Sequence, residues 1–90
     1  MKNIQDLKAK LSRNEIIVVP VNSSNLATWS YNPIKQVLTI LFNRHTIYQY
    51  TDVDKNIIFQ LLSAQEKNES IGKAFRNLIL DKYCYTKIQG

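Results

Sequence analysis

Few residues in the sequence could carry out catalysis or bind a metal, and they lie far apart. His45 is the single histidine and Cys84 the single cysteine, so a zinc site with the usual His/Cys ligands cannot form from them. A Ser–His or Cys–His catalytic pair would have to use His45, which lies in a predicted hairpin turn, where we expect a solvated side chain. Asp52 and Asp54 precede a predicted helix, whose start either carboxylate can cap. We therefore expect no metal, no cofactor and no enzymatic activity.

Length and composition limit the chain to one small domain. A chain of 90 residues buries a modest core and has little room for a deep enclosed pocket. One cysteine excludes an intramolecular disulfide. The longest apolar run, residues 16–21, is too short to span a membrane, so we expect no membrane partner. These features predict a reducing, cytoplasmic setting, either in a cell or in an infected cell.

The charge is moderately basic and uneven along the chain. Twelve Lys and Arg face seven Asp and Glu, for a net charge of +5. Most of the excess lies in residues 1–50, which hold six basic and two acidic residues. Such a balance favours acidic partners but does not distinguish nucleic acid from an acidic protein surface.

The first helix is predicted from the spacing of its apolar residues, and the first strand is predicted from its composition. Ile4, Leu7 and Leu11 recur at three and four residues, which predicts an amphipathic helix over about residues 3–12. Residues 15–21 are rich in β-branched side chains and predict a strand. Pro20 lacks a backbone N–H, so this strand should be at a sheet edge or end there.

Three segments, residues 26–31, 37–42 and 46–50, alternate and are joined by short turns, which predicts an antiparallel meander. In the first segment, Ala27, Trp29 and Tyr31 should share one face, with Leu26 on the other. The second segment is apolar on both faces and should be central.

The period changes to helical after Asp52. One helix has an apolar face formed by Ile57, Ile58, Leu61 and Leu62. A second helix begins with Ser70 as its N-cap and has Phe75 on its apolar face. Residues 83–88 predict a last short strand, in which Cys84 should be a half-buried hydrophobic side chain.

These elements predict an α+β fold, in which an antiparallel β-meander of three to four strands packs against two C-terminal helices, with a short N-terminal helix. Residues 1–14 form an amphipathic helical extension, and residues 15–90 form the domain. We expect Phe42, Tyr48, Tyr50 and Phe75 to lie in its core rather than to bind a ligand.

Several short segments, taken together and in their order along the chain, resemble the pattern of a known domain family. They are Val21–Leu26, Tyr31–Asn32, Leu38–Phe42, Tyr48–Gln49–Tyr50 with Val53, Leu61–Ala64, Glu69–Phe75, and Ile79, Tyr83 and Lys87–Ile88. Together they resemble the KTSC domain. This short domain is found at the C-terminus of some lysyl-tRNA synthetases and as a stand-alone protein in bacteria and phages.

The resemblance covers about three quarters of the chain and includes departures. The hairpin glycine usual in the family is replaced within residues 43–45, and Asp54 stands where proline is common. Arg76 stands where the family often has asparagine. The resemblance implies a non-catalytic domain that binds protein or nucleic acid. It also makes Ser23 and Ser24 candidate binding residues, although paired loop hydroxyls commonly bond local backbone groups.

Two functions remain open. The first is an accessory protein, as of a phage or mobile element, that acts through a protein partner. The second is a nucleic-acid-binding module that uses Trp and Tyr side chains exposed on the meander. Its candidate phosphate-binding surface combines the following residues: Arg44, Lys67, Ser70, Lys73 and Arg76.

Overall fold

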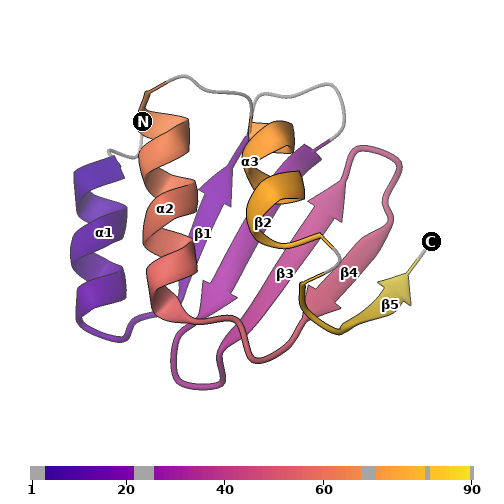
Figure 1. Cartoon of the computed structure of the whole chain (residues 1–90), viewed down its shortest axis with the longest axis horizontal. Helices are drawn as coiled ribbons and strands as arrows, with labels where there is room; N and C mark the ends of the chain where they lie inside the picture. The colour runs from indigo at the N-terminus through magenta and orange to yellow at the C-terminus, as the bar shows by residue number, and fades with distance from the viewer. Residues whose placement is uncertain (1–3, 22–25, 68–70, 81, 90) are drawn as a thin grey trace.

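The computed structural model describes residues 4–21, 26–67, 71–80 and 82–89. Its sheet is an antiparallel meander with the strand order β1-β2-β3-β4-β5 (Figure 1). The strands are β1 (Ile17–Pro20), β2 (Leu26–Asn32), β3 (Val37–Phe42), β4 (Ile47–Tyr50) and β5 (Tyr85–Gln89). The helices are α1 (Ile4–Ser12), α2 (Lys55–Glu66) and α3 (Ile71–Leu78).

The predicted α+β fold is confirmed, with a larger sheet than expected. The sheet has five strands because β1 joins the meander at one edge and β5 returns after α3 to pair with β4 at the other. The prediction that residues 37–42 form a central strand is confirmed. Pro20 ends the edge strand β1, as its missing backbone N–H predicted.

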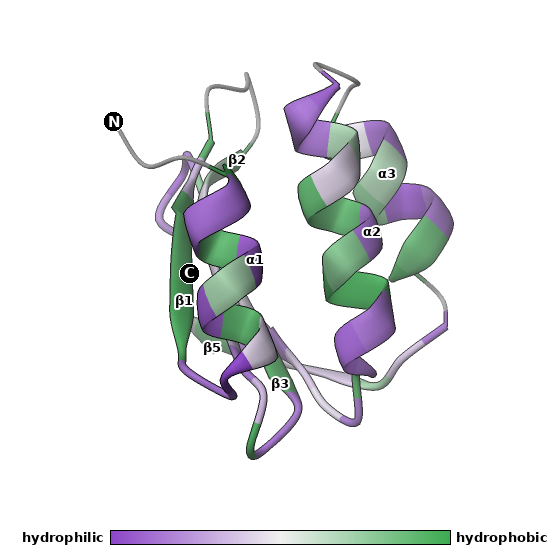
Figure 2. Ribbon diagram, turned by 90° about the vertical axis from the view of Figure 1, so that its left-hand side faces the viewer, coloured by the Kyte–Doolittle hydropathy of each residue, from purple (hydrophilic) through white to green (hydrophobic). Residues whose placement is uncertain are grey.

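The helices lie on one side of the sheet. α2 and α3 cover one face, and α1 packs beside β1 and α2, while none of the described helices covers the other face (Figure 2). Between the layers is one continuous core, to which every strand except β5 and each helix contributes. Its largest fully buried side chains include Tyr31, Tyr50, Leu38 and Ile58.

α1 is attached to the rest of the fold by apolar and polar contacts. Leu7 and Leu11 are buried in the shared core. Lys8 forms an ion pair with Glu66 of α2 at 3.6 Å, and the Gln5 side-chain amide donates a hydrogen bond to the same carboxylate at 2.6 Å. The N-terminal helix thus contributes to the core of the domain, beside the edge strand β1.

The alternation predicted for β2 is wrong at its start. Leu26, Trp29 and Tyr31 are all buried, although Leu26 was expected opposite the other two. The reason is a register shift in the pairing with β3: Leu26 pairs with Phe42 and Thr28 with Leu41, which leaves Ala27 as an extra residue. This β-bulge turns Leu26 to the core face.

Two buried side chains with polar groups link the layers. The Trp29 indole Nε1 donates to the Gln65 side-chain oxygen at 3.5 Å, and the Gln65 amide donates to the Pro20 carbonyl at 3.2 Å. The Tyr31 hydroxyl donates to the Val53 carbonyl at 2.5 Å. Burial raises the pKa of Tyr31 to about 12, with smaller contributions from the nearby Asp54 carboxylate and from Tyr83. Asp54 also caps α2, as predicted, by accepting from the Asn56 N–H at 2.8 Å.

Two predictions about single residues have different outcomes. His45 is exposed in the β3–β4 turn, as predicted, and its φ of 65° lies in the left-handed region. This conformation favours glycine over residues with a side chain. The prediction for Cys84 is wrong: it is an exposed free thiol that precedes the edge strand β5, in which residues 85–88 are exposed as well.

Candidate functional site

The predicted basic residues that the structure describes are all exposed. Arg44 lies in the β3–β4 turn, Lys67 caps the C-terminus of α2, and Lys73 and Arg76 lie on α3. The turn, the end of α2 and the start of α3 lie at the same end of the molecule (Figure 1). The remaining candidates, Ser23, Ser24 and Ser70, lie outside the described residues.

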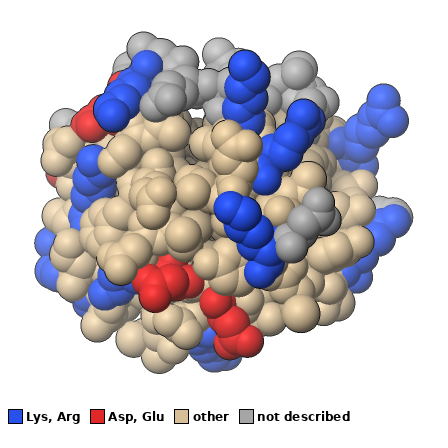
Figure 3. Space-filling view, in the orientation of Figure 1, with Lys and Arg blue, Asp and Glu red and all other residues tan. Residues whose placement is uncertain are grey.

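The helix face carries more basic than acidic side chains. Lys and Arg side chains lie over both halves of this face, whereas the described Asp and Glu side chains lie over the half that carries α1 and α2 and along the lower rim (Figure 3). The half that carries α3 and β5 therefore shows basic side chains with few acidic ones among them, and these basic side chains are spread out.

The expectation that the meander exposes Trp and Tyr side chains for base stacking is wrong for three of them. Trp29, Tyr31 and Tyr50 are at most 3% exposed, because all three face the helices. The prediction that Tyr50 and Phe75 belong to the core is confirmed, and Phe42 and Tyr48 are partly buried against it.

A row of aromatic rings crosses β3, β4 and β5 on the helix side and reaches the surface. Tyr48 lies between Phe42 and Tyr85, with ring centroids 5.5 and 5.2 Å away. Tyr50 lies between Tyr85 and Phe75, at 5.5 and 5.4 Å. Tyr85 is 58% exposed, so the row ends in an accessible ring.

Basic side chains flank this aromatic row. Lys87 pairs with Tyr48 across β4 and β5 and therefore lies on the same face of the sheet. Arg44 follows Phe42 by two residues in the adjacent turn. Sequence reasoning missed this arrangement because it depends on how β5 pairs with β4, about 35 residues away along the chain. The alternation of residues 46–50 was the only local signal.

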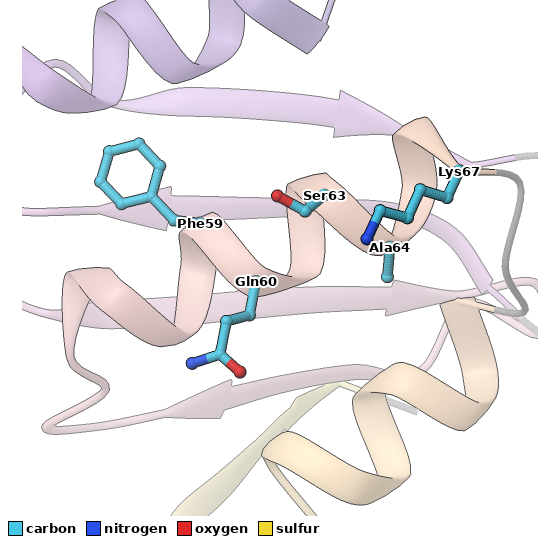
Figure 4. A pocket seen from close by; sticks show the side chains of 5 residues that line it. All are labelled: Phe59, Gln60, Ser63, Ala64 and Lys67. Atoms are coloured by element: carbon cyan, nitrogen blue, oxygen red, sulfur yellow. The ribbon is translucent and has the colours of Figure 1, made fainter.

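A shallow hollow of about 320 Å³ lies along the outer side of α2. Its lining residues all belong to the end or body of this helix: Phe59, Gln60, Ser63, Ala64 and Lys67. Phe59 and Ser63 point to one side of α2, while Gln60 and Ala64 point to the other (Figure 4). Since these side chains do not converge, the hollow offers no catalytic or ligand-binding arrangement.

The uncovered face of the sheet carries a polar row across β2, β3, β4 and β5, which ends beside Val18 of β1. Strand pairing places Ser30 between Val18 and Thr39, and Gln49 between Thr39 and Thr86. These residues alternate with the buried positions, so their side chains lie on the face away from the helices. Within the row, the Gln49 amide donates to the Thr39 hydroxyl at 3.4 Å.

Aliphatic side chains lie on both sides of this polar row. Leu41 pairs with Ile47 on one side, and Val37 pairs with Asn32 on the other. We call the outward-facing residues of the described strands the uncovered face: Val18, Pro20, Thr28, Ser30, Asn32, Val37, Thr39, Leu41, Ile47, Gln49 and Thr86. None of them is charged, although the chain contains 12 Lys or Arg residues and 7 Asp or Glu residues.

One part of the uncovered face is hollowed. The hollow has a volume of about 350 Å³ and is lined by side chains that include Ile16, Ser30, Val37, Thr39 and Gln49. Lys35, from the β2–β3 turn, is the one charged residue that lines it. Ile16 is 60% exposed and Val18 47% exposed, so the face presents accessible apolar surface beside hydroxyl and amide groups. This mixture of groups is common at protein–protein contacts.

Among the described residues there is no group of three or more His, Cys, Asp or Glu side chains that could hold a metal ion. None of the described helices is long and apolar enough to cross a membrane.

Comparison with known proteins gives a consistent result. The family model of the KTSC domain matches residues 22–83, which leaves α1, β1 and β5 outside the match. The structure is similar to the crystal structure of a KTSC domain protein from Yersinia pestis, with 30% sequence identity and a TM-score of 0.68. That similarity covers 81% of this chain and 97% of the other. The search of curated proteins found no relative.

Proposed function

The chain belongs to the KTSC domain family, and on that premise we propose that it is a small non-catalytic protein that acts by binding a protein partner. We place the contact on the uncovered face of the sheet. The cellular role that fits this activity is that of an accessory protein, as of a phage or mobile element, working in the cytoplasm.

The uncharged character of the uncovered face is the observation that carries this proposal. An antiparallel sheet with one face in water usually alternates apolar and polar side chains, with charged residues common on the wet face. Here the outward positions from Val18 to Thr86 are aliphatic, hydroxyl, amide or proline. Depletion of charge is also what distinguishes the centre of a protein interface from the rest of a protein surface.

Lys35 allows a direct test, because it lines the hollow of this face and carries a reactive amine. A tagged chain in a lysate of the cells that encode it is treated with an amine-reactive crosslinker, and the joined peptides are identified by mass spectrometry. We expect Lys35 to join to protein. Thr39→Arg should abolish these crosslinks, whereas Gln60→Arg, which adds the same charge at an exposed position of α2, should preserve them.

The proposal fails if Lys35 joins to no protein, or if Thr39→Arg leaves its crosslinks in place. Lys73, exposed on the helix layer, provides an internal comparison in the same sample. Its crosslinks should not respond to Thr39→Arg. Each variant is first checked for an unchanged melting temperature.

A second candidate function is binding of single-stranded nucleic acid, which the aromatic row specifically favours. Tyr85 and Tyr48 offer ring surface, and Lys87 and Arg44 offer cations for phosphates. Bases stack on such rings, and the neighbouring cations neutralise the backbone. Nuclease treatment of the lysate before crosslinking separates the two candidates, because only contacts bridged by nucleic acid are lost.

A further inference from the structure

We infer that the partner of the uncovered face is a second copy of this chain, so that two sheets pack face to face. This inference rests on the proposed function, since it identifies the partner at the same face. Two antiparallel sheets can stack about 10 Å apart with their side chains in contact.

The polar row is chemically suited to pair with itself. Hydroxyl groups of Ser30 and Thr39 and the amide of Gln49 can each donate and accept hydrogen bonds. A row of such groups is its own complement, whereas a row of charged groups needs the opposite charge on its partner. In a dimer with a two-fold axis the same patch meets itself, so a self-complementary patch satisfies the symmetry. The aliphatic residues Leu41, Ile47 and Val37 beside the row would leave water at the same time.

The charge of the chain favours this face over the others for self-association. Each copy carries a net charge of +5, so contact between two copies through the helix face would bring Lys and Arg side chains together. Like charges in contact cost free energy and disfavour such pairing. The outward-facing residues of the described strands are uncharged, so contact through the uncovered face does not bring like charges together. Lys35 lies at the β2–β3 turn, toward the rim of the face.

The size of the face limits the area that two copies can bury. The molecule measures 31 × 27 × 21 Å, and the sheet lies across the two longer axes. An ellipse with the two longer dimensions as its axes covers about 650 Å², which is an upper limit for the face because the outline includes α1, compared with about 800 Å² that each partner buries in a standard interface. The face is therefore smaller than a standard interface, so we expect a weak dimer with a Kd in the micromolar range or above.

Sedimentation velocity of the full chain tests this inference. The concentration should run from about 1 to about 500 µM to bracket the expected Kd. We expect a reversible shift from monomer to dimer. Gln49→Glu, which is nearly isosteric, and Thr39→Arg should each weaken the dimer at least about tenfold, because they place like charges in the shared interface. Gln60→Arg should dimerise like the parent chain. Because Gln49→Glu changes so little volume, the test holds even if Thr39→Arg does not fold.

A chain that stays monomeric to the highest concentration overturns the inference, as does dimerisation that Gln49→Glu leaves unchanged. The crosslinking experiment separates this failure from that of the proposed function. A monomeric chain whose Lys35 joins to other proteins, with loss in Thr39→Arg, refutes only the second copy as partner. A monomeric chain whose Lys35 joins to no protein refutes both.

Discussion

Tyr31 should make the stability of this protein fall steeply at alkaline pH. Its hydroxyl is buried and donates to the Val53 carbonyl, and its pKa is raised from 10.0 to about 12. A raised pKa means that the folded chain holds this proton more tightly than the unfolded chain. The stabilisation is therefore complete below pH 10 and is lost as the pH rises from 10 to 12.

The magnitude follows from these two pKa values. Linkage gives a loss of about 0.4 kcal/mol at pH 10, about 1.4 kcal/mol at pH 11 and about 2.3 kcal/mol at pH 12 from this group. The assay is urea unfolding between pH 8 and pH 11, followed by fluorescence of the buried Trp29. Other groups also titrate in this range, so the decisive quantity is the difference between the parent and Tyr31→Phe.

Tyr31→Phe should lower the free energy of unfolding at pH 8 by about 1 kcal/mol, because the buried Val53 carbonyl loses its donor. The deficit should shrink as the pH rises, since the variant lacks the group whose ionisation destabilises the parent chain. Near pH 11 the two proteins should be about equally stable by this reasoning. Two stability curves that run parallel from pH 8 to pH 11 would refute the link between burial of this hydroxyl and stability.

Four other predictions follow from particular residues. Ile58→Ala or Phe75→Ala should lower stability by about 2–5 kcal/mol through cavity formation; a melting temperature equal to that of the parent would contradict the core assignment. His45→Gly should raise stability by about 1 kcal/mol by relieving the left-handed conformation, and an unchanged urea midpoint would argue against this strain. Purified protein should contain no stoichiometric metal by elemental analysis. If nucleic acid binds, the log–log salt slope should be about −2 to −4, and replacing both Lys73 and Arg76 should flatten it by about one to two; a double variant with the parent slope would remove these two residues from the surface.

Periodicity predicted the elements well because it reports local burial. The spacing of Leu7 and Leu11, the alternation around Tyr50 and the helical period through Ile58 all correspond to buried side chains. The errors have non-local causes. The bulge at Ala27 arises from pairing between β2 and β3, and it moves Leu26 to the core without any change in local composition.

The candidate site was harder to predict for the same reason. Lys73 and Arg76 could be placed on one helix from their spacing, but the row from Phe42 to Tyr85 exists only because β5 pairs with β4. The uncovered face could have been suspected from the alternating uncharged positions of the meander. Its importance became clear only when none of the described helices was found to cover it.

The effect of salt distinguishes nucleic-acid binding from dimerisation through the uncovered face, because we expect salt to weaken the first and to strengthen the second. Binding to nucleic acid through cations weakens as salt rises, because the release of counterions into a more concentrated solution gains less entropy. Two copies that meet through the uncovered face carry a net charge of +5 each, so salt screens the repulsion between them and should strengthen their association. A chain that dimerises more tightly at 0.5 M than at about 0.05 M salt is thus held together by an uncharged face, since the Debye length falls about threefold over that range. Dimerisation that weakens with salt would instead require ion pairs between the copies, which the residues of the uncovered face cannot provide.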